Sequence, residues 1–263
     1  MQPYVLPLLF TLFVWWFSTG LILYLDRLPQ RTFKWTMAGA TVVCIFGIVG
    51  LAVSSAHTTV AAAYCAFTCA LLVWAWQEAA FLLGWVTGPR RTPCPEASQG
   101  WRRAWYALQT VVHHELALVV LALAVLGATW HQPNQTGWWT FAILWAMRQS
   151  AKLNVFLGVR NLSENFLPAH LKYLQTYFTR KPMNALLPVS VVVATGVAGP
   201  IWYAALANTA SAFEVASLTL AATLLSLAIL EHLFLVMPVS LEGLWSWALR
   251  AGHRAAPGSA GRA

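Results

Sequence analysis

Residues 35–56 read WTMAGATVVCIFGIVGLAVSSA, a run that contains no charged side chain. A helix rises about 1.5 Å per residue, so a run of about 20 apolar residues can cross the hydrocarbon core of a bilayer. Six further runs of this kind occupy about 3–25, 58–87, 104–130, 138–158, 185–208 and 212–238. The sequence therefore predicts an all-α, polytopic membrane helix bundle with about seven transmembrane helices.

The overall composition leads to the same class. Hydrophobic residues make up 59% of the 263-residue chain and charged residues 9%, whereas about a quarter of an average soluble domain is charged. The first run lacks a basic segment before it and a clear cleavage site after it, so we expect it to span the membrane rather than act as a signal peptide. These features exclude a soluble globular protein.

Basic residues mark one side of the predicted bundle. Fourteen of the 16 Lys and Arg residues follow the first, third, fifth and seventh runs, and the other two lie inside the fifth run. The positive-inside rule then places the N-terminus outside and the C-terminus in the cytoplasm. The net charge of +8 comes from this asymmetry, so it gives no support for nucleic-acid binding.

The seven runs are expected to form one transmembrane domain over residues 1–248. The loop 159–184 contains LPAHLKYLQTYF, whose apolar and polar residues alternate at helical spacing, which predicts a helix lying along the membrane interface. Residues 249–263 are rich in Ala, Gly and Arg, and we expect them to form a disordered cytoplasmic tail.

The most informative residues are ionisable side chains inside the runs. Such groups are costly in hydrocarbon, so they are expected to be paired, to coordinate a ligand or to face the protein interior. Counting from the ends of the runs puts them at a similar depth in the cytoplasmic half of four helices. They are Glu78, His113, His114, Glu115, Arg148, Lys152, Glu231 and His232.

Three interpretations of this polar layer stay open. The three glutamates could form a buried ion-pair network with Arg148 and Lys152 that fixes the register of the helices. Carboxylate and imidazole side chains could instead bind a metal ion, for which iron or manganese is the preferred choice, or one histidine could ligate a pigment or haem. The candidates for a metal or a pigment are Glu78, His113, His114, Glu115, Glu231, His232 and, from the loop, His170.

Other chemistries lack their motifs. The Glu-x-x-His pattern of carboxylate-bridged bundles is absent, and the only aspartate, Asp26, lies at a membrane edge, so a Ser-His-Asp triad is not expected. Neither G-x-x-x-x-G-K-[ST] nor G-x-G-x-x-G occurs, so nucleotide binding has no support.

The loop after the fifth run holds an unusually dense polar set. We expect this set to bind a partner subunit or to cap the polar layer from the cytoplasm. Its members are Asn154, Arg160, Asn161, Glu164 and Asn165, beside His170.

Four stretches together resemble a known family: WQEAAFLLGWVTGPRR (76–91), HHELAL (113–118), KLNVFLGVRNLSENFLP (152–168) and LEHLFLVMP (230–238). They are similar to the PuhE-type photosynthetic complex assembly proteins of purple phototrophic bacteria, from the first run to about residue 248. The resemblance implies a multi-pass protein of the bacterial inner (intracytoplasmic) membrane whose gene lies near that of the reaction-centre H subunit. It also implies a role in assembling the reaction centre or its core antenna, with those subunits as partners and with bacteriochlorophyll handling as a means. It supplies no catalytic residues.

Two functions of different classes follow, so whether the chain is an enzyme stays open. The first is a non-enzymatic assembly factor for the photosynthetic complex. The alternative is a membrane-embedded, metal-dependent oxidoreductase, for instance with a di-iron site, acting on a tetrapyrrole or lipid-soluble substrate. Alanine replacements of Glu78, His114 or Glu231 would separate them, because the alternative predicts loss of a pathway product.

Overall fold

Each apolar run of the sequence forms a helix in the computed structural model, which describes residues 3–162, 164–238 and 241–249. The seven long helices are α1 (Val5–Asp26), α2 (Phe33–Ser55), α3 (Val60–Leu82), α4 (Gly100–Thr129), α5 (Thr136–Leu157), α6 (Leu186–Ala205) and α7 (Ala212–Phe234). Short 3₁₀ helices are η1 (Gln30–Thr32), η2 (Glu164–Phe166), η3 (Ala169–Tyr177) and η4 (Leu241–Trp245). The described residues contain no β-strand, and the predicted all-α membrane class is confirmed.

Six of the helices are long and apolar enough to cross a membrane: α1, α2 (counted together with η1), α3, α4, α6 and α7. The seventh, α5, has 22 residues, but it carries Arg148, Gln149 and Lys152 and is correspondingly less apolar. Its polar side chains bond to neighbouring helices, Arg148 to Glu78 on α3 and both Gln149 and Lys152 to Glu115 on α4.

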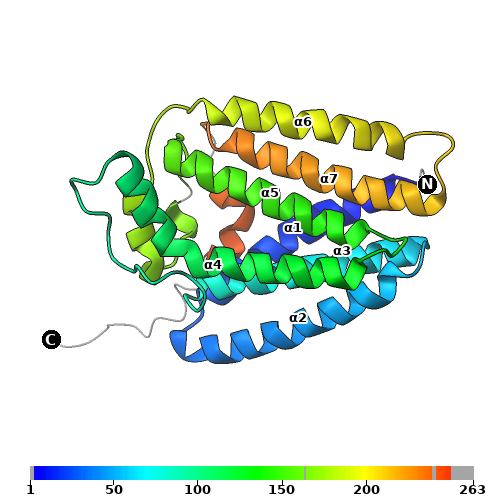
Figure 1. Cartoon of the computed structure of the whole chain (residues 1–263), viewed down its shortest axis with the longest axis horizontal. Coiled ribbons are helices and arrows are strands. Elements are labelled where there is room, and N and C mark those ends of the chain that lie inside the picture. Colours follow the sequence, from blue (N-terminus) through cyan, green and yellow to red (C-terminus); the bar gives the residue numbers. More distant parts are fainter. Residues whose placement is uncertain (1–2, 163, 239–240, 250–263) are drawn as a thin grey trace.

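The helices lie side by side along the long axis of the molecule, and α3 and α7 occupy its centre (Figure 1). Within their most apolar segments, 44% of α3 and 56% of α7 is buried, compared with 17% of α1 and of α6. The outer helices α2 and α6 each pack mainly on a sequence neighbour, α2 on α3 and α6 on α7. Each of the other long helices packs against α3, α7 or both.

Helix α1 contacts α7 and the segment that follows it. The indole Nε1 of Trp16 donates to the carbonyl of Leu244 at 3.0 Å, and Nε1 of Trp245 donates to the carbonyl of Trp16 at 2.9 Å. Trp245 is buried and packs edge-on against Trp15, with 5.5 Å between the ring centroids. The first and last helical segments of the chain are thus held together by tryptophan side chains.

Helix α3 ends at Leu82, five residues before the predicted end at 87, because Gly84 adopts a left-handed conformation with φ +77°. The amide of Gly84 donates to the carbonyl of Phe81, and the amide of Trp85 donates to that of Ala80. This pair of bonds is the Schellman motif, which favours glycine at the left-handed position. Residues 83–92 therefore form a turn at the basic end of the bundle.

The loop 159–184 contains helical structure where an interfacial helix is predicted, but it is the 3₁₀ helix η3. Leu171, Leu174 and Tyr177 are buried, and their spacing of three residues matches the 3₁₀ period. Its position at a membrane interface stays a prediction. The predicted tail 249–263 lies, apart from residue 249, outside the described residues.

Candidate functional site

The polar layer is built from α3, α4, α5 and α7, as the sequence predicts. Glu78 lies on α3, His114 and Glu115 on α4, Arg148 and Lys152 on α5. Glu231 and His232 lie on α7. The residues on α3, α4 and α5 form one cluster of hydrogen bonds and ion pairs, whereas Glu231 is exposed.

Two ion pairs organise this cluster. Nη2 of Arg148 lies 2.8 Å from Oε2 of Glu78, and Nζ of Lys152 lies 2.7 Å from Oε1 of Glu115. Gln149 also donates from its side-chain amide to Oε2 of Glu115. Glu115 thus bonds to α5, whereas His114 bonds to α3, as their different directions around the α4 axis predict.

The Arg148–Glu78 pair leaves two buried atoms without a partner in the described part of the chain. They are Oε1 of Glu78 and Nε of Arg148. The side chain of Glu78 is 12% exposed, whereas that of Arg148 is 41% exposed. The carboxylate of Glu78 on α3 is thus mostly buried, whereas the guanidinium of Arg148 on α5 is accessible from outside the bundle.

His114 is fully buried and bonded to Gln77. Nε2 of Gln77 donates to Nδ1 of His114 at 2.6 Å and to the His114 carbonyl at 3.0 Å. Since a carbonyl only accepts hydrogen bonds, the amide nitrogen must face His114, so Nδ1 accepts and the ring proton is on Nε2. That Nε2 has no partner in the described residues, and the ring packs on Phe81 with 4.6 Å between centroids.

The Gln77–His114 contact gives a testable stability prediction. Gln77→Leu leaves the buried Nδ1 without its donor, so the free energy of unfolding in detergent should fall by about 1–3 kcal/mol. The double variant Gln77→Leu with His114→Leu removes both polar partners. Its loss in the free energy of unfolding should therefore be smaller than the sum of the losses of the two single variants. Strictly additive losses would contradict a direct hydrogen bond.

The two polar residues of α7 differ in environment. His232 is 2% exposed; its Nδ1 donates to the carbonyl of Ala228 at 2.8 Å, and its Nε2 lies 2.9 Å from the hydroxyl of Ser150. Glu231 is exposed, and its Oε1 accepts a hydrogen bond of 2.7 Å from Nε1 of Trp15. No ion pair is formed by Glu231 within the described ranges.

The remaining histidines of the candidate set lie apart from the cluster. His113 is exposed on the outer face of α4, whereas its neighbour His114 points inward. His170 lies on η3, where it contacts the end of α3 through the carbonyl of Leu82 at 2.9 Å. In the portion that the structure describes, no three His, Cys, Asp or Glu side chains are grouped so that they could hold a metal ion. The candidate ligands therefore separate into pairs and single residues.

Much of the polar set in the loop is used within the chain. Asn154 is buried and donates to the carbonyl of Ser150 at 2.9 Å, and Asn161 donates to the carbonyl of Phe234 at 2.7 Å. Glu164 forms an exposed ion pair with Arg180 at 3.1 Å. Arg160 is exposed, and the side chain of Asn165 lies outside the described part. Binding of a partner by this set stays a prediction.

Sequence reasoning missed the uncharged members of the layer. Gln77, Gln149 and Ser150 bond to its charged or imidazole side chains, and Trp15 bonds to Glu231 from α1. Gln77 and Gln149 each adjoin a charged residue inside an otherwise apolar run. That adjacency is the signal that could have identified them.

Comparison with known proteins places the chain in a family. The sequence profile described as "Protein of unknown function (DUF3623)" matches residues 1–256. The chain is 37% identical over 243 residues to an uncharacterized 30.4 kDa protein in the puhA 5′ region of Rhodobacter capsulatus, covering 91% of this chain and 88% of that protein. No solved structure matches.

Proposed function

The chain belongs to the DUF3623 family, and we propose that it is an integral membrane assembly factor for the photosynthetic reaction centre and its core antenna. Its place is then the bacterial inner (intracytoplasmic) membrane, with the C-terminus in the cytoplasm. The name of the R. capsulatus relative refers to the puhA 5′ region. That location supports the expectation of a gene near the one for the reaction-centre H subunit.

The observation that carries the proposal is that two polar side chains lie exposed on apolar helices. His113 is exposed on the outer face of α4, and Glu231 is exposed on α7 beside Trp15. Polar groups at membrane depth are costly unless they are matched by a partner. A client helix or a pigment that binds for a limited time would supply that partner, because it covers the exposed polar group while it is bound.

The two residues suit different parts of a photosynthetic client. An imidazole on an outer helix face can serve as the axial ligand of the magnesium of bacteriochlorophyll, since neutral imidazole is a common metal ligand. A carboxylate that already accepts from Trp15 has further lone pairs for a donor on a neighbouring helix. The proposal assigns His113 to the pigment and Glu231 to the client helix.

The test uses a phototrophic strain in which the chromosomal gene is deleted and replaced by variants. His113→Leu and Glu231→Leu should each lower the near-infrared absorbance of assembled reaction centre and core antenna several-fold, while extractable bacteriochlorophyll is still made. His57→Leu removes an imidazole from an exposed loop and is the matched control, for which normal complexes are expected. An immunoblot of the chain in membranes establishes that each variant accumulates.

Two results would overturn the proposal. Normal amounts of both complexes in the deletion strain would exclude a role in assembly. Loss of bacteriochlorophyll with accumulation of a precursor, in the deletion strain and in Glu78→Ala, would instead favour a metal-dependent oxidoreductase that acts on a tetrapyrrole.

A further inference from the structure

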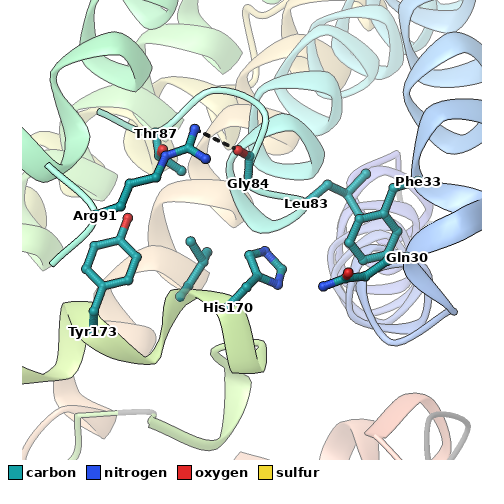
Figure 2. A pocket seen from close by; sticks show the side chains of 9 residues that line it. Gln30, Phe33, Leu83, Gly84, Thr87, Arg91, His170 and Tyr173 are labelled. Carbon is teal, nitrogen blue, oxygen red and sulfur yellow. Dashed lines mark hydrogen bonds between the residues drawn. The ribbon is translucent and has the colours of Figure 1, made fainter. Parts of the chain in front are cut away.

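A cavity of about 350 Å³ lies at the basic end of the bundle, separate from the polar layer. It is open to the surroundings on one side and is lined by residues of η1, the start of α2, the turn after α3 and the helix η3. Figure 2 shows Arg91, Thr87 and Tyr173 toward one end and Gln30, Phe33 and Leu83 toward the other, with His170 between them. Its volume is within the range of small-molecule sites, about 300–1,000 Å³.

One end of the cavity holds a cation with unused donors. Nη2 of Arg91 donates to the carbonyl of Gly84 at 3.2 Å, which orients the guanidinium, and no acidic residue lines the cavity. Arg91 forms no ion pair with any carboxylate in the described ranges. A guanidinium has five N–H donors in a planar fork, so most of its capacity is available to a ligand.

Among the described residues, two hydroxyl groups beside Arg91 have no partner in full hydrogen-bond geometry. Thr87 is 1% exposed, and its Oγ1 is buried; the hydroxyl of Tyr173 is buried as well. The hydroxyls of Thr87 and Tyr173 lie close enough to interact with each other, but neither reaches full hydrogen-bond geometry with a described residue. Burial raises the pKa of Tyr173, so its phenol stays protonated and can donate. Buried polar groups of folded proteins are usually hydrogen-bonded, so these two hydroxyls are available to a ligand in the cavity.

His170 supplies a different function at the centre of the cavity. Its Nε2 donates to the carbonyl of Leu82 at 2.9 Å, and burial lowers the pKa of the ring, so the imidazole is neutral near neutral pH. Nδ1 is then an acceptor. The cavity thus combines Arg91 and two hydroxyl donors at one end with an acceptor in the middle.

We propose that this cavity binds the phosphate group of an anionic membrane phospholipid, held by Arg91, Thr87 and Tyr173. Several donors that converge from different side chains require a group with several acceptor oxygens on one centre, as phosphate provides, and arginine binds phosphate through two parallel hydrogen bonds. His170 accepts from a hydroxyl of the lipid headgroup, as in phosphatidylglycerol. The apolar side chains of Phe33, Leu83 and Leu171 face the glycerol backbone and the first methylene groups.

The location of the cavity favours a lipid as the source of the phosphate. The cavity lies where α2 begins and α3 ends, at the end of the bundle that carries the basic loops. Basic residues next to transmembrane helices attract anionic lipid headgroups. This inference does not depend on the proposed assembly function, because none of the cavity residues belongs to the polar layer or to the exposed pair His113 and Glu231.

The test measures thermal unfolding of the full, delipidated chain in detergent during titration with phosphatidylglycerol or with phosphatidylcholine. A ligand that binds the folded state raises Tm with its concentration, so the titration reports affinity. Arg91→Gln should require about ten times more phosphatidylglycerol for half of the Tm rise, because a charge-assisted hydrogen bond is lost. Arg31→Gln removes an exposed charge from the same region and is the matched control, for which the titration should not change.

Thr87→Val keeps the proposal testable if Arg91→Gln does not fold. Valine has the shape of threonine, so the lipid-free chain should be as stable as the wild type or more stable, while phosphatidylglycerol binding should weaken about threefold. A Tm rise by sodium phosphate at constant ionic strength, dependent on Arg91 and not matched by phosphatidylglycerol, would assign the site to free phosphate and overturn the lipid assignment. Equal effects of both lipids, or equal titrations of Arg91→Gln and Arg31→Gln, would overturn the site itself.

Discussion

Gly88→Ala is expected to lower the free energy of unfolding by about 3 kcal/mol or more, because it forces a methyl group into the backbone of α4. A Cβ at this position would lie 2.1 Å from the carbonyl oxygen of Gln109 and 2.5 Å from the carbonyl carbon of Thr110. Backbone atoms inside a helix cannot move aside as a flexible side chain can. The turn after α3 must therefore separate from α4.

This separation would also break two hydrogen bonds that join the turn to α4. The amide of His114 donates to the carbonyl of Thr87 at 2.9 Å, and the amide of Arg90 donates to the carbonyl of Gln109 at 3.3 Å. Unfolding of the purified chain in detergent measures the loss. Gly127→Ala is the control, since nothing lies within 4 Å of a Cβ there and the helix should gain up to about 1 kcal/mol. Similar effects of the two substitutions would refute the close contact.

Glu78→Gln is expected to give the second large loss, about 2–3 kcal/mol in the free energy of unfolding. The substitution leaves the guanidinium of Arg148 without a carboxylate at the bundle interior, where Glu78 is 12% exposed. The expected value is lower than for a fully buried pair because Arg148 is itself 41% exposed and water can screen its charge. Chemical unfolding in detergent measures the difference.

The matched control for Glu78→Gln is Glu164→Gln, which removes the carboxylate of the exposed pair with Arg180. Exposed pairs contribute about 0–1 kcal/mol, so this variant should be close to the wild type. Combining Glu78→Gln with Arg148→Gln should recover part of the loss, because the unpaired charge is gone. Equal losses for Glu78→Gln and Glu164→Gln would mean that burial does not strengthen the Arg148–Glu78 contact.

The fold class and the grouping of the charges could be predicted from the sequence. Apolar runs of sufficient length have few alternatives to membrane helices, and their predicted bounds agree with the observed helices to within about five residues. Ionisable side chains at one depth on several helices are expected to pair, to bind a ligand or to face the interior, and the pairs of Arg148 with Glu78 and of Lys152 with Glu115 are one of the arrangements that the sequence leaves open.

The sequence could not determine which of two adjacent histidines faces inward. His113 and His114 are consecutive residues, about 100° apart around the helix axis, so both lie near one edge of the polar face. Contacts with other segments determine which of the two rings is buried. Here Gln77 on α3 and the carbonyl of Thr87 both bond to His114. Contacts between distant segments leave no periodic pattern in the sequence.

The cavity was also beyond prediction from the sequence. Its walls come from the start of α2, the turn that Gly84 creates after α3, and the helix η3. A continuous apolar run through residue 87 predicted helix where the chain instead turns. The local signal at Gly84 is weak, because glycine inside a membrane helix is common.

The packing of α1 on α7 has a consequence for biosynthesis. The pairs α2–α3 and α6–α7 are neighbours in the chain, so each pair can dock as soon as its second helix leaves the ribosome. Helix α1 is made before α7 and Trp245, on which it packs, although it can pack earlier on α3 through Phe10 and Tyr64. The nascent chain therefore holds α1 in the membrane without α7 beside it until α7 has been made, so the contact that closes the bundle forms after the other helices have been inserted.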